Sequence, residues 1–147
     1  MAKLRERQKA RRMLVQALYS WDLGGADIAT VDAQFRAVND MTKVDDELFR
    51  SVLFGVAKHL SEIEDAIQPH LDRDQEQLDP ISRAVLRLST YELLHSIEVP
   101  YRVVINEGIN LAKTFGPEDA FKFVNGVLDG IAARSRAAEV ADRSRSG

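Results

Sequence analysis

Positively charged side chains crowd the first residues of the chain. Residues 1–12 carry six Lys or Arg side chains against one acidic side chain, whereas residues 13–131 carry ten basic side chains against twenty acidic ones. The whole chain has a formal net charge of -3, so a basic arm over residues 1–12 precedes an acidic body. This asymmetry predicts a polyanionic partner, and a solvated arm that only improves solubility is the alternative. The basic side chains are Lys3, Arg5, Arg7, Lys9, Arg11 and Arg12.

The face of the first predicted helix that carries several of these cations also carries two apolar side chains. At about 100° per residue, Tyr19 and Leu23 fall opposite the apolar stripe, on the side of Arg12. An aromatic and an aliphatic side chain beside arginine are typical of a protein-docking ridge. Scattered surface hydrophobic residues are also normal, so both interpretations stay open.

A second exposed aromatic side chain is predicted near the end of the chain. If Phe121 and Val124 face the core, Phe123 lies about 160° away, near Asp119 and beside Lys122. An exposed ring next to a lysine suits stacking on an unpaired base, with the lysine on a phosphate. The alternatives are that Phe123 covers a neighbouring helix or makes a dimer contact.

No residue pattern supports catalysis, a metal or a cofactor. The chain has no cysteine, and its three histidines, His59, His70 and His95, show no spacing typical of metal ligands. Glu92 lies within a predicted apolar helix. A glutamate in such a position is more often a hydrogen-bonded structural residue than an acid–base catalyst. Glycine-rich phosphate loops and nucleophile elbows are absent from the sequence. We therefore expect a protein without enzymatic activity.

The chain carries no sequence signal for a membrane. No apolar run approaches the roughly 20 residues that a transmembrane helix needs. The basic start is followed by an amphipathic pattern that Gln16 and Asp22 interrupt, unlike the apolar region of a signal peptide. A cytoplasmic protein is the expectation.

Only helical periodicity is visible, so we predict an all-α, single-domain bundle of about seven helices over residues 4–134. Asp45 and the Asp79-Pro80 pair are strong start signals, and Gly116-Pro117 separates the last two helices. Thr30 is a candidate N-cap, and Ser61 begins a capping-box pattern. Residues 135–147 lack bulky side chains and are predicted to be a disordered tail. The expected helices are 4–23, 30–38, 46–60, 61–68, 80–95, 100–115 and 117–134.

Three sequence runs resemble the NusB family of bacterial transcription antitermination factors. The longest is V-P-Y-R-V-V-I-N-E-G-I-N-L-A-K-T-F-G-P-E-D-A-F-K-F-V-N-G-V-L-D, from Val99. V-Q-A-L-Y-S-W-D-L from Val15 is similar to the family's first helix, and R-A-V-L-R-L-S-T-Y-E-L from Arg83 to its central helix. The resemblance covers nearly all of the chain except the tail, and it implies an all-helical RNA-binding fold.

The resemblance implies a non-enzymatic factor that binds boxA RNA together with NusE, a small-ribosomal-subunit protein. That complex joins NusA, NusG and RNA polymerase and supports transcription of ribosomal RNA operons. The implied RNA contacts are the basic start, with Arg12 in place of the acidic residue of the best-known members, and Asp119, Lys122 and Phe123. The implied NusE surface comprises Tyr19, Leu23 and Ser82, although Ser82 departs from the carboxylate expected there.

Two other functions remain as alternatives. A NusB-like domain also forms the RNA-binding part of ribosomal RNA cytosine methyltransferases, which need a cofactor-binding α/β domain and catalytic cysteines that this sequence lacks. A bundle that only binds other proteins is the third interpretation. The sequence leaves open whether the free protein is a monomer or a homodimer.

Overall fold

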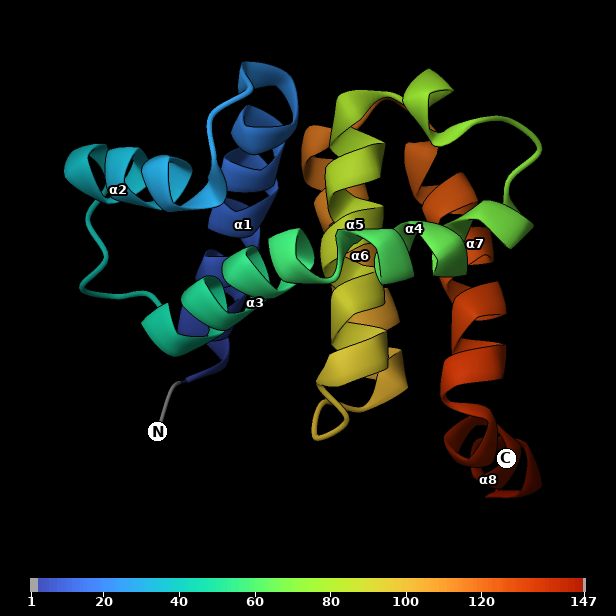
Figure 1. Ribbon diagram of the computed structural model, residues 1–147. Helices are drawn as coiled ribbons and strands as arrows, with labels where there is room; N and C mark the ends of the chain where they lie inside the picture. Colours follow the sequence, from blue (N-terminus) through green and yellow to red (C-terminus); the bar gives the residue numbers. More distant parts are fainter. Residues whose placement is uncertain (1–2, 147) are drawn as a thin grey trace.

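The computed structural model describes residues 3–146, with side chains through Asp142; Met1, Ala2 and Gly147, at the ends of the predicted arm and tail, lie outside them. The described residues form eight α-helices and no strand, which confirms the all-α prediction (Figure 1). Two short 3-10 helices, η1 (Gln68–His70) and η2 (Gln75–Gln77), connect α4 to α5. The α-helices are α1 (Leu4–Gly24), α2 (Ile28–Val38), α3 (Asp46–Lys58), α4 (Leu60–Ile67), α5 (Pro80–His95), α6 (Tyr101–Phe115), α7 (Ala120–Ser135) and α8 (Ala137–Ser146).

Aspartate side chains cap the starts of three helices, α2, α3 and α5. Asp45 accepts a hydrogen bond from the Leu48 N–H at 3.1 Å, and Asp79 accepts one from the Ser82 N–H at 2.8 Å. These bonds satisfy backbone donors that have no partner inside the helix. The cap of α2 is Asp27 and not Thr30, because Thr30 is the residue whose N–H the Asp27 carboxylate binds.

Two further predicted boundaries differ by one to three residues. The chain breaks between α3 and α4 at His59 rather than at Ser61. The helix predicted to start at Pro117 starts at Ala120, because Asp119 adopts a left-handed backbone conformation with φ 67°. That conformation lies in the turn between α6 and α7.

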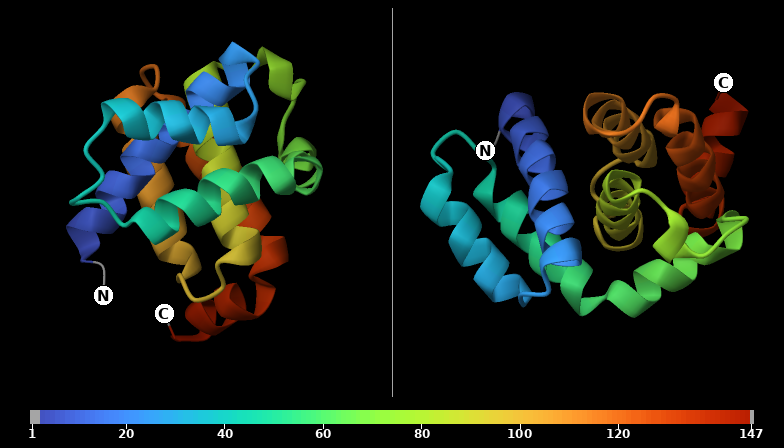
Figure 2. Two further views of the ribbon diagram at one scale, coloured as in Figure 1. Left: turned by 60° about the vertical axis from the view of Figure 1, so that its left-hand side comes forward. Right: turned by 90° about the horizontal axis from the view of Figure 1, so that it is seen from above.

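Helix α5 forms the centre of the bundle. It packs against α1, α3, α4, α6 and α7, and from above it lies between α1 and α7 (Figure 2). Its apolar side chains Val85, Leu86, Leu88 and Leu93 are almost completely buried. Burial on several sides is typical of a helix at the centre of a bundle.

A buried ion pair joins α1 to this central helix. The Arg11 guanidinium donates from Nε to Glu92 Oε2 at 3.0 Å and from Nη2 to Oε1 at 2.9 Å. Burial alone would lower the pKa of Arg11, but the hydrogen bond and the charge of Glu92 raise it above its ordinary value. Arg11 is 1% exposed, so the expectation that it contacts RNA is wrong. It is a core residue because its charge is neutralised inside the bundle.

The predicted disordered tail is wrong for α8. Arg136 is buried after the end of α7 and donates to the backbone carbonyls of Leu93 at 2.8 Å and Ser96 at 3.0 Å. Glu139 accepts from the Tyr101 N–H at 2.8 Å, at the start of α6. One arginine thus binds carbonyls left free at the end of α5, and one glutamate binds a free donor of α6. These contacts compensate for the lack of bulky apolar residues.

Arg11→Ala is expected to lower the free energy of unfolding by about 3–5 kcal/mol, because it leaves the Glu92 carboxylate buried without its partner. Urea denaturation followed by circular dichroism measures this change. Arg12→Ala is the matched control, since Arg12 is the next residue and is exposed. Similar stabilities of the two variants would contradict the structural role of Arg11.

Candidate nucleic-acid and protein interfaces

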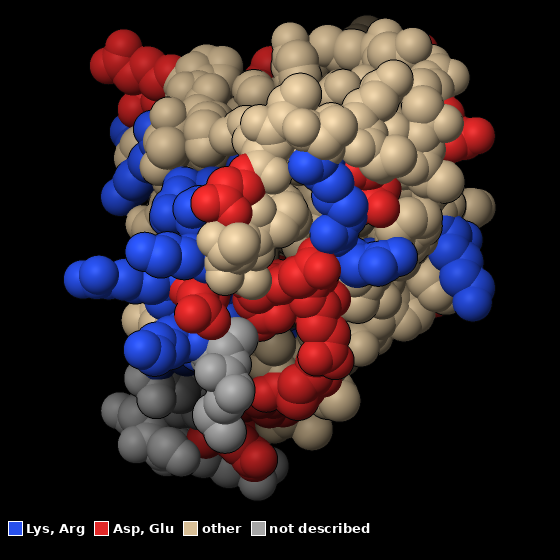
Figure 3. All heavy atoms as spheres, turned by 90° about the vertical axis from the view of Figure 1, so that its left-hand side faces the viewer, with Lys and Arg blue, Asp and Glu red and all other residues tan. Residues whose placement is uncertain are grey.

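Five basic side chains surround a surface hollow of about 460 Å³ at the start of α1. Figure 3 shows basic side chains gathered on this face, with acidic side chains beside them. Glu6 and Gln8 also line the hollow. We call its cations the basic cluster: Lys3, Arg5, Lys9, Arg12 and Lys43.

The helical geometry of α1 selects which cations join the basic cluster. The predicted arm is helical from Leu4 onward, so its side chains hold fixed angular positions. Arg5, Lys9 and Arg12 follow the spacing i, i+4, i+7 and therefore form one stripe. Arg11 instead precedes Leu14 by three residues, which places it on the buried face. That spacing is a signal in the sequence from which its burial could have been inferred.

Arg7 lies away from the basic cluster. It is half-buried and lines a separate hollow of about 480 Å³, together with Arg11 and the acidic residues Asp45, Glu47 and Glu98. Carboxylates that line a hollow repel a phosphate group that enters it. Of the six cations in the predicted basic arm, four thus share one hollow, Arg7 lines another, and Arg11 is buried.

Lys43 is a member of the basic cluster that the sequence analysis missed. It belongs to the connection between α2 and α3, which the hydrogen bond from the Asp45 N–H to the Glu6 carbonyl ties to α1 at 3.1 Å. Asp40 lies near Lys9 and Lys43. The pKa of its carboxyl is lowered mainly by the hydrogen bond from the Thr42 N–H and, to a smaller extent, by the charges of Lys9 and Lys43. No local pattern in the sequence predicts this contact between distant segments.

Tyr19 and Leu23 continue the same stripe of α1 toward its end. Their side chains are 39% and 54% exposed, which places them on the outer surface as the helical spacing predicts. Asp22 anchors this end of α1 through ion pairs with Arg83 at 2.6 Å and Arg87 at 3.0 Å. We call Tyr19 and Leu23 the α1 ridge. They lie on the same helix as Arg5, Lys9 and Arg12 of the basic cluster.

Ser82 does not belong to the α1 ridge. It is 2% exposed, and its hydroxyl has no hydrogen-bond partner among the described residues. It lines a hollow of about 280 Å³ between α5 and the start of α7, which Asp119 and Phe123 also line. The structure thus groups Ser82 with two residues that were predicted to contact RNA, because it faces inward from the first turn of α5.

Phe123 is half-buried in that hollow rather than fully exposed. The cation near its ring is Arg73, with Cζ 6.0 Å from the ring centroid, and not Lys122. Three carboxylates, Asp79, Glu118 and Asp119, line the same hollow. Carboxylates disfavour a phosphate but accept hydrogen bonds from base amino groups, so the hollow suits a base better than a phosphate.

Lys122 lies over a different ring. Its Nζ atom is 5.9 Å from the centroid of Phe121, and Lys113 Nζ at the end of α6 lies 4.8 Å from the same centroid. Asp119 also approaches Lys122 at 3.5 Å, in an exposed pair that contributes little to stability. Two cations around one aromatic ring form a second basic site at the corner of α6 and α7, and the sequence analysis missed Lys113.

A polar hollow lies between these two basic sites. It measures about 220 Å³ between α1 and α6, and Arg12, Asn110 and Thr114 are among its lining residues. Arg12 belongs to the basic cluster, while Asn110 and Thr114 lie on the last turns of α6 next to Lys113. Glu107 also lines this hollow and accepts a hydrogen bond from the Gln8 side chain at 3.1 Å, so donors and acceptors are mixed there.

The described residues offer no membrane span: within 3–146, no helix combines the length and apolar character needed to cross a bilayer.

Comparisons with known proteins agree on one family. A model of the NusB family matches residues 8–133. The transcription antitermination protein NusB of Pseudomonas savastanoi pv. phaseolicola is 54% identical over 140 residues, which are 95% of this chain and 85% of that protein. The solved structure of T. maritima NusB matches with a TM-score of 0.82 and 32% identity, covering 96% of this chain and 99% of its own. A crystal structure of the antitermination factors NusB and NusE with dsRNA matches with a TM-score of 0.77 and 28% identity, covering 88% and 97%.

Proposed function

The chain belongs to the NusB family, and on that premise we propose that it binds boxA-type single-stranded RNA together with NusE. As a member of this family it is a transcription antitermination factor and not an enzyme. The proposed complex joins NusA, NusG and RNA polymerase and keeps transcription of ribosomal RNA operons processive. Such a factor acts on nascent transcripts, in the cytoplasm.

The observation that carries this proposal is the single outer stripe of α1. Arg5, Lys9 and Arg12 occupy its first half, and the α1 ridge occupies its second half. Cations on a regular spacing neutralise successive phosphates. An exposed aromatic and an exposed aliphatic side chain supply the apolar centre of a protein interface. One helix can therefore bind RNA and NusE side by side, which explains why the two would bind jointly.

The corner of α6 and α7 supplies the second part of the proposed RNA site. Lys113 and Lys122 provide charge for a phosphate, and the hollow that contains Phe123 provides an apolar wall and carboxylate acceptors for a base. A base can enter such a hollow only when it is unpaired. This supports a single-stranded ligand, whereas the related NusB–NusE structure contains dsRNA.

The double variant Arg5→Gln, Arg12→Gln is expected to bind RNA more weakly in the presence of NusE. The salt dependence of RNA binding is also expected to be less steep. Loss of two phosphate contacts reduces the slope of log K against log salt by roughly 1.4, because each contact contributes about 0.7 for a single strand. Fluorescence anisotropy with labelled boxA-type RNA at several salt concentrations measures this slope. Arg50→Gln with Arg134→Gln is the control for the same change of charge at exposed sites. Equal slopes for both variants would refute the basic cluster as the phosphate site.

Phe123→Leu is expected to weaken RNA binding by about 1–3 kcal/mol, because leucine fills part of the space but cannot stack on a base. Phe123→Trp keeps an aromatic face and is expected to retain most of the affinity. The same anisotropy assay measures both variants after thermal denaturation has confirmed that they fold. If the Leu variant binds as tightly as the unmodified chain, Phe123 does not stack.

Tyr19→Asp is expected to abolish co-purification with NusE, since it places a charge at the centre of an apolar contact. Val38→Asp introduces the same charge at an apolar residue that is 82% exposed at the end of α2, and it is expected to leave the complex intact. Affinity capture of NusE from a mixture of the two purified proteins measures the outcome. Survival of the complex with the Tyr19 variant would show that NusE docks elsewhere.

A further inference from the structure

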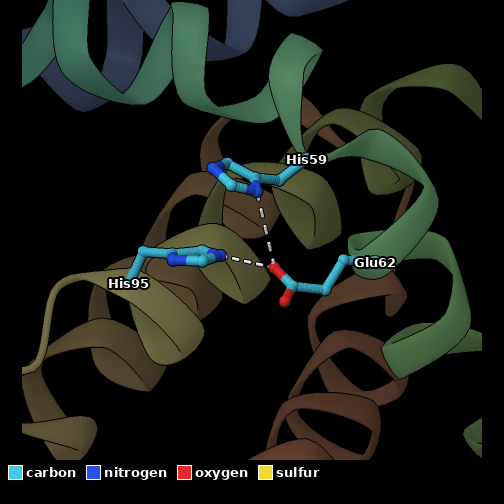
Figure 4. Close-up of side chains that lie close together, drawn as sticks. All are labelled: His59, Glu62 and His95. Carbon is cyan, nitrogen blue, oxygen red and sulfur yellow. Dashed lines mark hydrogen bonds and ion pairs between the residues drawn. The ribbon is translucent and has the colours of Figure 1, made fainter.

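Two histidines that lie far apart in the sequence meet at the end of α5. The rings of His59 and His95 stack with centroids 4.3 Å apart, and Glu62 lies against both (Figure 4). The sequence predicts no metal-like pairing of histidines. Residues 59 and 95 are separated in the chain by α4, the two 3-10 helices and most of α5. We call His59, Glu62 and His95 the histidine cluster.

The ligand atoms of the histidine cluster converge. His59 Nδ1 lies 3.8 Å from Glu62 Oε1, and His95 Nε2 forms a hydrogen bond or ion pair with the same oxygen. One nitrogen from each ring and one carboxylate oxygen all lie within 4.8 Å of one another. Atoms bound to one tetrahedral Zn²⁺ are about 3.3 Å apart, given bonds of roughly 2.0–2.1 Å. Small side-chain rotations would bring this set to that spacing.

The backbone and its neighbours hold the histidine cluster in place. His59 is the junction between α3 and α4, and Glu62 follows it by three residues, so both side chains project from the same side of the chain. Tyr91 stacks on His95 with centroids 5.1 Å apart. Tyr91 is itself fixed against Gly55, where any Cβ atom would collide with its ring. The cluster therefore joins two elements whose relative position the core already determines.

The surroundings of the histidine cluster favour a cation. His95 is the last residue of α5, where the negative end of the helix dipole lies. The side chains of His59 and His95 are 33% and 28% exposed, so water and ions can reach them.

We propose that the histidine cluster binds one Zn²⁺ ion or a similar transition-metal ion. Imidazole nitrogens are preferred ligands of Zn²⁺, Cu²⁺ and Ni²⁺, whereas Mg²⁺ prefers oxygen ligands alone. Three protein ligands leave a fourth position for water on the exposed side. The bound ion would connect the junction of α3 and α4 to the end of α5. This site shares no residue with the proposed RNA and NusE surfaces.

Isothermal titration of the tag-free full chain with ZnCl₂ tests the proposal. One Zn²⁺ per chain is expected, with no heat from MgCl₂ under the same conditions. Glu62→Gln and His95→Gln are each expected to weaken Zn²⁺ binding by at least about tenfold. Asp65→Asn is the matched control, because it removes an exposed carboxylate from the same helix outside the cluster. Absence of stoichiometric binding, or equal binding by all variants, would overturn the proposal.

A second measurement needs no substitution and remains decisive if a variant fails to fold. In nitrogen-15 NMR spectra of the unmodified chain, Zn²⁺ is expected to shift the ring signals of His59 and His95 and to leave those of His70 unchanged. His70 contacts Gly130 of α7, away from the cluster. A response of all three histidines, or of none, would contradict a specific site.

Discussion

A charged pair survives in a helical core only when each partner neutralises the other, and Arg11 and Glu92 meet this condition with two hydrogen bonds. The bond fixes more than the distance between α1 and α5. Because a guanidinium that binds a carboxylate through two parallel bonds permits only one orientation, it also sets the rotation of α1 about its axis. That rotation decides which side chains of α1 face solvent, and both proposed binding surfaces depend on it.

The outer stripe of α1 is the consequence of that rotation. Near the C-terminal end of α1, Asp22 forms ion pairs with Arg83 and Arg87 of α5. Helix α1 is therefore held against α5 at two places along its length. With both ends fixed, Arg5, Lys9 and Arg12 stand in line with Tyr19 and Leu23. A factor that must bind RNA and a protein at once gains from this arrangement, because neither partner has to order a flexible segment of α1. The two proposed surfaces thus lie on one helix that is held against α5 by ion pairs.

Local sequence patterns predicted the features that depend on interactions between residues close together in the chain. Helical periodicity and the caps at Asp45 and Asp79 identified the bundle and its central helix, and the spacing on α1 identified Tyr19 and Leu23 as outward-facing. Contacts between distant segments could not be predicted in this way: the partner of Arg11 in the core, Glu92, the approach of Lys43 to α1, and the approach of Lys113 to Phe121. The tail was misjudged for a similar reason, since Arg136 orders it by binding carbonyls of α5 that no apolar pattern reveals. Counting charges cannot distinguish a cation that binds a ligand from one that binds the core.

The central claim is that the core divides the cations of α1 into a ligand-binding set and a structural set. The most direct test is nitrogen-15 NMR of the arginine Nε–Hε groups in the complex with NusE, before and after addition of boxA-type RNA. The account predicts that the signals of Arg5 and Arg12 shift on RNA binding, while the signal of Arg11 stays in place and exchanges slowly with solvent. A shift of Arg11 equal to that of its exposed neighbours, or no response from Arg5 and Arg12, would contradict the account.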